Sequence, residues 1–346
     1  MYHPRFTITP EINNYIARIE SIRQKVKDTK ILPEQEITLR FRATIDAVHS
    51  STTIEGNPLN KNQVIQALAG KLNSWEKAVI EVQNYKKALD WIAGRIKNGN
   101  DISLKDIFKL HAFVSDNLLP KQKVGRLREG PVYIVDIIGR KEIVKYIGPS
   151  PKQLLVLLND LFDWLQDNKA VLHPILAAGI LHYEFVSIHP FSDGNGRVTR
   201  LLVKLLLDLT GYDFRGALVL DKYYLANRLL YYRSLNQAKH YQAQRKADLT
   251  NWLNFFIRGF YETAKDLERE ISIVSISSNK SVIRLSGEEI QILDFVKQMG
   301  KITSRDTADI IKGSERTIQR RIKALMRKQL LVRKGRGKNS YYILKS

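Results

Sequence analysis

The chain has 346 residues, enough for two or three domains, and contains no cysteine. A disulfide framework and a metal site with thiolate ligands are therefore excluded, and a cytoplasmic protein is expected. The formal net charge is +21, and about half of this excess falls after residue 273. Such asymmetry predicts an anionic partner for the C-terminal part, most often nucleic acid.

One apolar segment, residues 170–191, is long enough to suggest a membrane span. It also contains Pro174, Glu184 and three histidines, so we interpret it as a buried helix and expect no membrane partner. The first residues, MYHPRFTITPEINNYI, have no charged region followed by an apolar one. A secretory signal is therefore not expected.

Apolar residues at helical spacing predict a mainly helical protein. Helices are expected over residues 8–30, 34–50, 61–69, 74–96, 103–117, 152–167, 171–187, 195–210, 223–240 and 249–271. Residues 124–151 differ, because they contain the β-rich runs VYIVDI and EIVKYI separated by GRK. These runs predict a β-hairpin over residues 132–146.

The end of the chain has a pattern typical of a winged helix-turn-helix domain over 288–346, after a serine-rich linker at 271–287. Three short helices are expected, then two strands around the basic turn RKGRGK. The helix within SERTIQRRIKALMRKQ (314–329) is the candidate recognition helix for double-stranded DNA. The candidate DNA contacts are Arg316, Thr317, Gln319, Arg320, Lys323, Arg333, Lys334 and Arg336. Winged helices also dock proteins, so this alternative stays open.

Residues 188–200, IHPFSDGNGRVTR, concentrate polar groups that core packing does not need. Gly194 and Gly196 flank Asn195 immediately before an apolar helical run. Glycines at a helix N-terminus let backbone N–H groups converge on an anion, which the helix dipole also favours. The segment therefore predicts an anion site.

The charged side chains of the same segment indicate what the anion is. Arg197 and Arg200 are three residues apart and share a helical face, as expected for binding of a polyphosphate. Asp193 is suited to hold Mg²⁺ against phosphate oxygens. His189 is suited to take a proton from an attacking hydroxyl near pH 7.

HPFSDGNGRVTR resembles the signature of the Fic family, HPFx(D/E)GNGRxxR, at every specified position. The resemblance implies a Fic-type helical core over 101–270, preceded by an N-terminal helical region over 1–100. It implies transfer of AMP from ATP to a Ser, Thr or Tyr hydroxyl of a protein, including this chain, with release of pyrophosphate. The hairpin at 132–146 resembles the Fic flap, which takes a target segment along its edge.

The resemblance also implies roles for single residues. His189 would be the general base, and Asp193 the Mg²⁺ ligand. Nucleotide contacts are implied for Gly194, Asn195, Gly196, Arg197, Val198, Thr199 and Arg200. In YYRSLNQAK (231–239), Tyr232 and Asn236 are candidate contacts of the adenosine.

The segment SSTTIEGN (50–57) is similar to the Fic inhibitory motif, (S/T)xxxE(G/N), through Ser51, Glu55 and Gly56. The resemblance implies that Glu55 pairs with Arg200. A carboxylate held by that arginine would occupy the place of the γ-phosphate and misalign the α-phosphorus, and a misplacement near ~1 Å can cost ~10²-fold in rate. An auto-inhibited enzyme is therefore expected.

Two other functions stay open. The chain could be a DNA-binding transcriptional regulator whose Fic core senses a nucleotide, although an intact His189 argues against a core that only binds. It could also be a Fic enzyme that uses another nucleotide or removes AMP. The sequence is compatible with a homodimer but does not fix the oligomeric state. His173 and His182 are expected to be core histidines rather than metal ligands.

Overall fold

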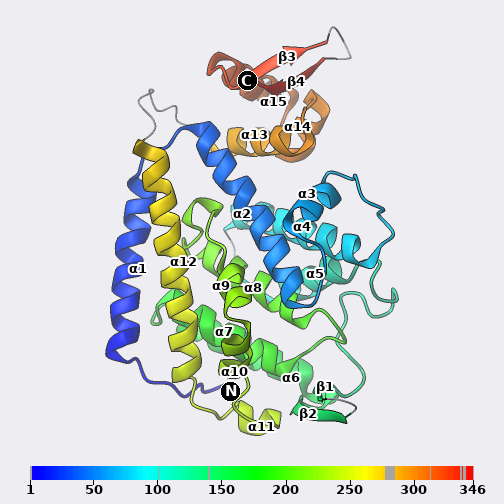
Figure 1. The fold of residues 1–346 in the computed structure, drawn as a ribbon, viewed down its shortest axis with the longest axis vertical. Coiled ribbons are helices and arrows are strands. Elements are labelled where there is room, and N and C mark those ends of the chain that lie inside the picture. The colour runs from blue at the N-terminus through cyan, green and yellow to red at the C-terminus, as the bar shows by residue number, and fades with distance from the viewer. Residues whose placement is uncertain are drawn as a thin grey trace. The chain divides into compact units, whose positions relative to one another are not determined.

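The computed structural model describes residues 2–99, 101–138, 141–276, 285–311, 313–335, 337 and 340–345. Figure 1 shows a mainly helical chain with two short hairpins. Contacts divide it into two compact units. The larger unit comprises the residues up to Gln24, with Asp46–Phe214 and Leu218–Asp266, and the smaller unit comprises Lys25–Ile45, Arg215–Ala217 and the residues from Leu267 onward.

The helices follow the chain in an order close to the expected one. Before the first hairpin lie α1 (Pro10–Asp28), α2 (Pro33–Ile54), α3 (Lys61–Leu68), α4 (Lys77–Arg95) and α5 (Leu104–Ser115). After it come α6 (Leu154–Asn168), α7 (Pro174–Ile188), α8 (Asn195–Leu209), α9 (Leu220–Ala226), α10 (Arg228–Leu235), α11 (Tyr241–Gln244) and α12 (Thr250–Ile276). The last helices are α13 (Gly287–Met299), α14 (Ser304–Ile311) and α15 (Glu315–Arg327). None of the helices in the described ranges is both long and apolar enough to cross a membrane.

Helix α7 is the central helix of the larger unit, since nearly all its side chains are buried and both α6 and α8 pack against it. Its Gly179 lies against α12, where Trp252 Nε1 donates to the Gly179 carbonyl at 2.7 Å. A Cβ atom at Gly179 would lie 2.8 Å from Leu253 Cδ2. A side chain at Gly179 would therefore require Leu253 and Phe256 of α12 to shift.

The first hairpin pairs β1 (Tyr133–Ile138) with β2 (Lys141–Ile147) in antiparallel register, with an irregularity at Ile134/Val135. Tyr146 is buried, and its hydroxyl donates to the Ser187 carbonyl at the end of α7. The side chains of Tyr133, Val135 and Ile143 are exposed. The hairpin is thus attached to the core at its base while apolar side chains remain at its surface.

The expected continuous helix over 223–240 is wrong. Asn227 separates α9 from α10, and α10 ends at Leu235. The Oε1 atom of Gln244 then accepts hydrogen bonds from the N–H groups of Gln237 and Ala238 at 3.1 and 2.8 Å. These amides bond to a side chain that follows them in the chain rather than to carbonyls of a preceding helical turn, so the chain is not helical there.

The smaller unit contains α13, α14 and α15, followed by the antiparallel strands β3 (Leu331–Lys334) and β4 (Tyr341–Leu344). Its core is formed by apolar side chains that include Ile37, Ile292, Val296, Ile302, Ile318, Ile322, Leu325 and Tyr342. Helix α12 runs to Ile276, so the first residues of the expected linker are helical. Residues 277–284 of that linker, like Arg336, lie outside the described residues.

Candidate active site

The signature segment begins where α7 ends. His189 has a left-handed backbone (φ 50°), which ends the helix, and its N–H donates to the Phe185 carbonyl at 3.2 Å. Asn195 closes the following loop, because Oδ1 accepts from Phe191 N at 2.9 Å and Nδ2 donates to Phe191 O at 2.8 Å. Both the oxygen and the nitrogen of the Asn195 side-chain amide therefore hold the loop. The backbone of Asn195 is the part that stays available to bind an anion.

Gly194 directly precedes α8 and has φ of +80°, a conformation that disfavours any other residue. A Cβ atom there would also lie 3.1 Å from Val114 Cγ1. The first N–H groups of a helix have no partner within the helix and carry the positive end of its dipole. The tight turn at Gly194 thus leaves the N-terminus of α8 suited to an anion, as the sequence predicts.

His189 is held in one tautomer. Its Nδ1 atom lies 3.1 Å from the Val186 carbonyl, which can only accept, so Nδ1 carries the proton and Nε2 keeps its lone pair. Burial lowers the pKa of His189 from its ordinary value, an effect that the Val186 bond and Glu55 partly oppose. His189 is therefore a neutral imidazole at pH 7 with Nε2 ready to accept a proton.

A second histidine, which the sequence analysis did not single out, supports the loop. His111 on α5 is fully buried, and its Nδ1 accepts from Gly125 N at 3.0 Å. Its Nε2 therefore carries the proton and donates to the Asp193 carbonyl at 3.2 Å. The ring stacks on Phe191 with centroids 3.8 Å apart, and burial lowers the pKa of His111 to about 4. His111 is thus a neutral structural support of the signature loop.

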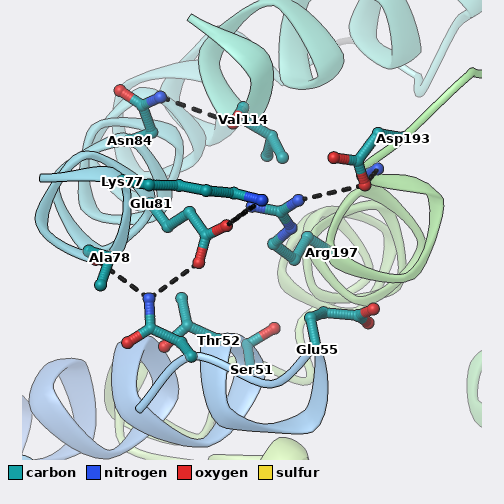
Figure 2. A network of polar contacts seen from close by, with 12 residues as sticks. Ser51, Thr52, Glu55, Lys77, Ala78, Glu81, Asn84, Val114, Asp193 and Arg197 are labelled. Atoms are coloured by element: carbon teal, nitrogen blue, oxygen red, sulfur yellow. Dashed lines mark hydrogen bonds and ion pairs between the residues drawn. The ribbon is translucent and has the colours of Figure 1, made fainter. Parts of the chain in front are cut away.

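Arg197 lies between two carboxylates, as Figure 2 shows. Its Nη2 is 3.4 Å from Asp193 Oδ1, and its Nη1 is 3.7 Å from Glu81 Oε1 on α4. The Arg197 side chain is buried, yet its Nε and Nη1 atoms make no hydrogen bond to any described residue. A buried guanidinium with unused donors is suited to bind an added anion such as phosphate.

Glu81 also contacts the chain just beyond Glu55. Asn57 is buried, and its Nδ2 donates to Glu81 Oε2 at 2.8 Å and to the Ala78 carbonyl at 3.0 Å. Its Oδ1 accepts from Leu59 N at 3.1 Å. The segment that follows α2 is therefore fastened to α4, and through Glu81 to Arg197.

The predicted pair of Glu55 and Arg200 is present. Arg200 Nη2 donates to Glu55 Oε1 at 2.8 Å and to the Ser51 carbonyl at 2.9 Å, and Nε donates to Ser51 Oγ at 2.7 Å. Gly196 makes room for this pair, because a Cβ atom there would lie 2.2 Å from Glu55 Oε1. The carboxylate thus sits directly against the glycine-rich start of α8.

Arg200 has a further partner in Asp221 of α9, whose Oδ1 lies 3.0 Å from Nε. Burial alone would lower the pKa of Arg200, but Glu55 and Asp221 help to hold it well above its ordinary value. Arg200 therefore stays positively charged.

Other candidate residues have different surroundings. Val198 and Thr199 are fully buried, and Thr199 Oγ1 donates to the Asn195 carbonyl at 2.7 Å, so their side chains stabilise α8. The Tyr232 hydroxyl lies 3.4 Å from the Ile54 carbonyl, next to Glu55. Asn236 follows the last residue of α10 and is exposed. The core histidine His182 is confirmed, because it is buried and lies 2.9 Å from the Tyr231 hydroxyl.

Comparison with known families identifies this region. The model of the Fic/DOC family matches residues 101–207, which include α5, the hairpin, α7 and most of α8. The chain carries a Fic domain. This confirms the family expected from HPFSDGNGRVTR and places all residues of that signature inside the matched range.

Curated relatives carry the same domain. The chain is 32% identical over 203 residues to a protein named protein adenylyltransferase Fic from Aedes aegypti, covering 56% of this chain and 39% of the relative. It is 31% identical over 198 residues to a protein of that name from Nematostella vectensis, covering 56% and 43%. The chain thus spans about two fifths of the length of these relatives.

Solved structures show a similar fold. A Fic family protein from Desulfovibrio desulfuricans G20 matches with a TM-score of 0.64 at 24% identity, covering 99% of this chain and 98% of that one. Fic-1 from C. elegans (residues 134–508) matches with a TM-score of 0.60 at 25% identity, covering 77% and 73%. The expected mainly helical fold with a Fic-type core and a hairpin is confirmed.

Three residues around the Fic site were missed by sequence reasoning. Glu81, His111 and Asp221 lie on three different helices, each within an ordinary helical pattern. Their burial, visible in the structure, distinguishes them from solvated side chains, and for His111 and Asp221 the sequence carries no signal of it. Glu81 and Asn84, three residues apart on α4, do share the face toward the site, and a polar pair on a buried face was the one available clue.

Proposed function

We propose that this chain is an auto-inhibited protein adenylyltransferase. It transfers AMP from ATP to a Ser, Thr or Tyr hydroxyl of a protein, including its own chain. The observation that carries the proposal is the arrangement of one neutral histidine beside a helix N-terminus and two buried arginines. The name shared by the curated relatives, protein adenylyltransferase, supports it.

The proposed chemistry needs one base and one leaving group. The target hydroxyl oxygen attacks the α-phosphorus of ATP, its proton passes to Nε2 of His189, and the bond from the α-phosphorus to the bridging oxygen breaks. Pyrophosphate leaves with the electron pair of that bond. A neutral His189 with a free Nε2 is required at the start; burial favours the neutral form, and the bond from Nδ1 to Val186 fixes the tautomer that leaves Nε2 unprotonated.

The α8 N-terminus and the arginines receive the phosphates. Backbone N–H groups at Gly194–Gly196 bind the α- and β-phosphates, and Arg197 and Arg200 bind the β- and γ-phosphates. Charge that develops on pyrophosphate is stabilised by these preorganised donors. Arg197 fits this role, since its Nε has no hydrogen-bond partner among the described residues and its Nη1 has only the long ion pair with Glu81.

Mg²⁺ fits at Asp193. Its carboxylate is about half exposed (52%), beside the start of α8, and magnesium commonly uses one or two carboxylates together with substrate phosphates. The described residues contain no cluster of three or more possible metal ligands, so the phosphates themselves would complete the coordination. The ion would neutralise phosphate charge as pyrophosphate leaves.

Glu55 is proposed to keep the enzyme nearly silent. As long as Arg200 bonds to Glu55 and Ser51, it is not available to the γ-phosphate, and the carboxylate repels that group. ATP then binds with a misplaced α-phosphorus, and a shift of about 1 Å costs about 10²-fold in rate.

The test uses ATP labelled on the α-phosphate, with Mg²⁺ and purified full-length protein. Four proteins are compared: the wild type, Glu55→Gly, Glu55→Gly with His189→Ala, and the control Glu76→Gly at an exposed position before α4. We expect Glu55→Gly alone to become labelled, at least about 10²-fold above the wild type. Equal labelling of the wild type and Glu55→Gly contradicts auto-inhibition. No label in any protein, with ATP still bound, contradicts AMP transfer and favours a nucleotide sensor or another transferred group.

We also propose that α13–α15 with β3 and β4 form a winged helix-turn-helix that binds double-stranded DNA. Arg316, Arg320 and Lys323 are exposed on α15, while Ile318, Ile322 and Leu325 on the opposite face are buried. The Thr317 hydroxyl bonds to Ser314 Oγ and Gln319 Nε2 donates to Ser304 Oγ, so these side chains are less available than the basic ones. Arg333 and Lys334 are exposed on β3, at the wing.

DNA binding by this tail is tested by titrating a labelled duplex at several salt concentrations. Contacts to phosphates predict an affinity that falls steeply with salt. A duplex that does not bind even at low salt contradicts the proposal and favours protein docking.

A further inference from the structure

Arg128 lies in the chain between α5 and the hairpin, and its side chain is buried with 7% of its surface exposed. Its guanidinium donates three hydrogen bonds to three carbonyls. Nε donates to His189 O at 2.8 Å, Nη1 to Gly130 O at 2.7 Å, and Nη2 to Pro149 O at 2.7 Å. The backbone N–H of Arg128 adds a fourth, to Pro190 O at 2.9 Å.

These acceptors belong to two parts of the Fic domain. Gly130 and Pro149 lie just outside the two ends of the hairpin, which runs from Tyr133 to Ile147. His189 and Pro190 belong to the signature. One planar side chain therefore joins both stems of the proposed target-binding hairpin to the backbone of the proposed base.

Burying a guanidinium is costly unless its donors are satisfied, and a carboxylate usually helps to satisfy them. Within the described part of the chain, no carboxylate lies in ion-pair distance of Arg128. Burial lowers the pKa of the Arg128 guanidinium. An apolar side chain could not donate to the three carbonyls, so what Arg128 supplies at this place is a fixed geometry of three hydrogen bonds from one planar group.

The neighbouring packing restricts the same junction. A Cβ atom at Gly148 would lie 2.4 Å from Val132 Cγ1 and 3.3 Å from Arg128 Nη2. Gly148 N also donates to Val132 O at 3.1 Å. The two stems thus pack closely around the Arg128 guanidinium and fix its position.

We propose that Arg128 is a positioning residue that holds the base His189 and both stems of the hairpin in one fixed arrangement, so that a hydroxyl on a segment docked along the hairpin reaches Nε2. The inference rests on the proposed AMP transfer. The hydrogen bonds of Arg128 go to the carbonyls of His189, Gly130, Pro149 and Pro190 and not to the proposed phosphate-binding residues, so it affects the target hydroxyl rather than ATP.

The test places Arg128→Lys and Arg128→Met in the Glu55→Gly chain, with Arg95→Lys as the control. Arg95 is also a largely buried arginine in the larger unit, where it bonds to Asp106 far along the chain from the signature. Lysine keeps the charge of Arg128 but cannot reach three carbonyls in one plane. The maximal rate of self-labelling is measured against ATP concentration, and ATP binding is measured separately by calorimetry.

We expect both Arg128 variants to lower the maximal rate by about 10²-fold, as a misplacement near 1 Å does. We expect the half-saturating ATP concentration and the calorimetric affinity to stay within about twofold of those of the Glu55→Gly parent, because the substitution leaves the contacts with ATP in place. The Arg95→Lys control keeps the parent rate. A retained maximal rate, or a parallel loss of ATP affinity, overturns the inference.

A second measurement does not depend on activity. Amide hydrogen exchange is followed at Gly148 in the hairpin stem and at His189, whose N–H groups bond to Val132 O and Phe185 O. Arg128→Lys should speed exchange at both amides, and Arg95→Lys at neither. Faster exchange at only one of them, or at none, overturns the inference even if no protein is labelled. If the Glu55→Gly parent is not labelled but Arg128→Lys still speeds exchange at both amides, the result contradicts the proposed function and not the role of Arg128.

Discussion

The Oε1 atom of Glu55 lies 2.8 Å from Nη2 of Arg200, and the same guanidinium bonds twice to Ser51, four residues earlier on α2. The end of α2 thus presents a hydroxyl, a carbonyl and a carboxylate to one arginine. Because Arg200 is buried and fully charged, each of these partners contributes to where it points.

Ser51→Ala should release Arg200 in part. The Nε bond to Ser51 Oγ is lost, while the bonds to the Ser51 carbonyl and Glu55 remain. A hydrogen bond to a charged group is worth about 1.5–3 kcal/mol, so we expect self-labelling above the wild type but below Glu55→Gly. Labelling with α-labelled ATP measures it. A Ser51→Ala protein as active as Glu55→Gly would show that Ser51, rather than the carboxylate, causes the inhibition.

Asn57→Ala should weaken inhibition without touching Arg200. The buried Asn57 side chain fastens the segment after Glu55 to Glu81 and Ala78 on α4. Its loss leaves Glu81 without this donor, so we expect about 1–3 kcal/mol less stability in urea unfolding, and a several-fold rise in labelling. Added to Glu55→Gly, Asn57→Ala should give no further rise. A rise in that double variant would mean that Asn57 acts on Arg197 and not through Glu55.

Glu184→Gln should change how stability depends on pH. Burial raises the pKa of Glu184 from 4.5 to about 7, although the Tyr241 hydroxyl and Arg245 partly oppose it. The folded state holds this proton more tightly than the unfolded state. The contribution of Glu184 is therefore complete below pH 4.5 and is lost as pH rises through 7, at a cost of about 3 kcal/mol.

Urea unfolding of wild type and Glu184→Gln at pH 4.5 and pH 8 measures this effect. Glutamine cannot ionise, so the variant should lose about 3 kcal/mol less than the wild type over that interval. Equal losses in both proteins would show that Glu184 titrates near its ordinary value in the folded state.

Arg320→Ala should weaken DNA binding by the smaller unit. Arg320 is exposed on α15, whereas its neighbour Arg321 pairs with Glu288. Loss of one phosphate contact should reduce the slope of log affinity against log salt by about one. Arg321→Ala is the matched control, because it removes the same charge from a side chain that faces its own domain. Equal effects of both variants would indicate net charge rather than a contact.

Sequence reasoning predicted the geometry of the site where it is local. HPFSDGNGRVTR places His189, the glycine turn and both arginines within one helix end and one helix start, so their proximity follows from spacing alone. The Glu55–Arg200 pair joins residues 145 positions apart, and it was expected only because a known motif resembles it.

The residues that support the site could not be predicted in this way. Arg128 reaches the site from a loop, and Glu81 and His111 reach it from two other helices. No regular spacing in the sequence links these three residues to the signature. The wrong helix at 223–240 has the same origin, because Gln244 bonds to Gln237 and Ala238 across a turn that propensity does not reveal. In both cases the sequence does not reveal which side chain a polar group will bond to in the folded protein.

The two bonds from Asn195 to Phe191 have a consequence for the chemical lifetime of the protein. Asparagine followed by glycine readily deamidates, since the next backbone nitrogen attacks the side-chain carbonyl, and asparagine is a thermolabile residue. Here the amide is buried and held at both ends at the start of a helix, which keeps that nitrogen away from it. Once the loop opens, for example on heating, the product aspartate would face the Phe191 carbonyl with an oxygen in place of the donor. The loop could not return to its original conformation, so each opening carries a chance of irreversible deamidation at the centre of the site.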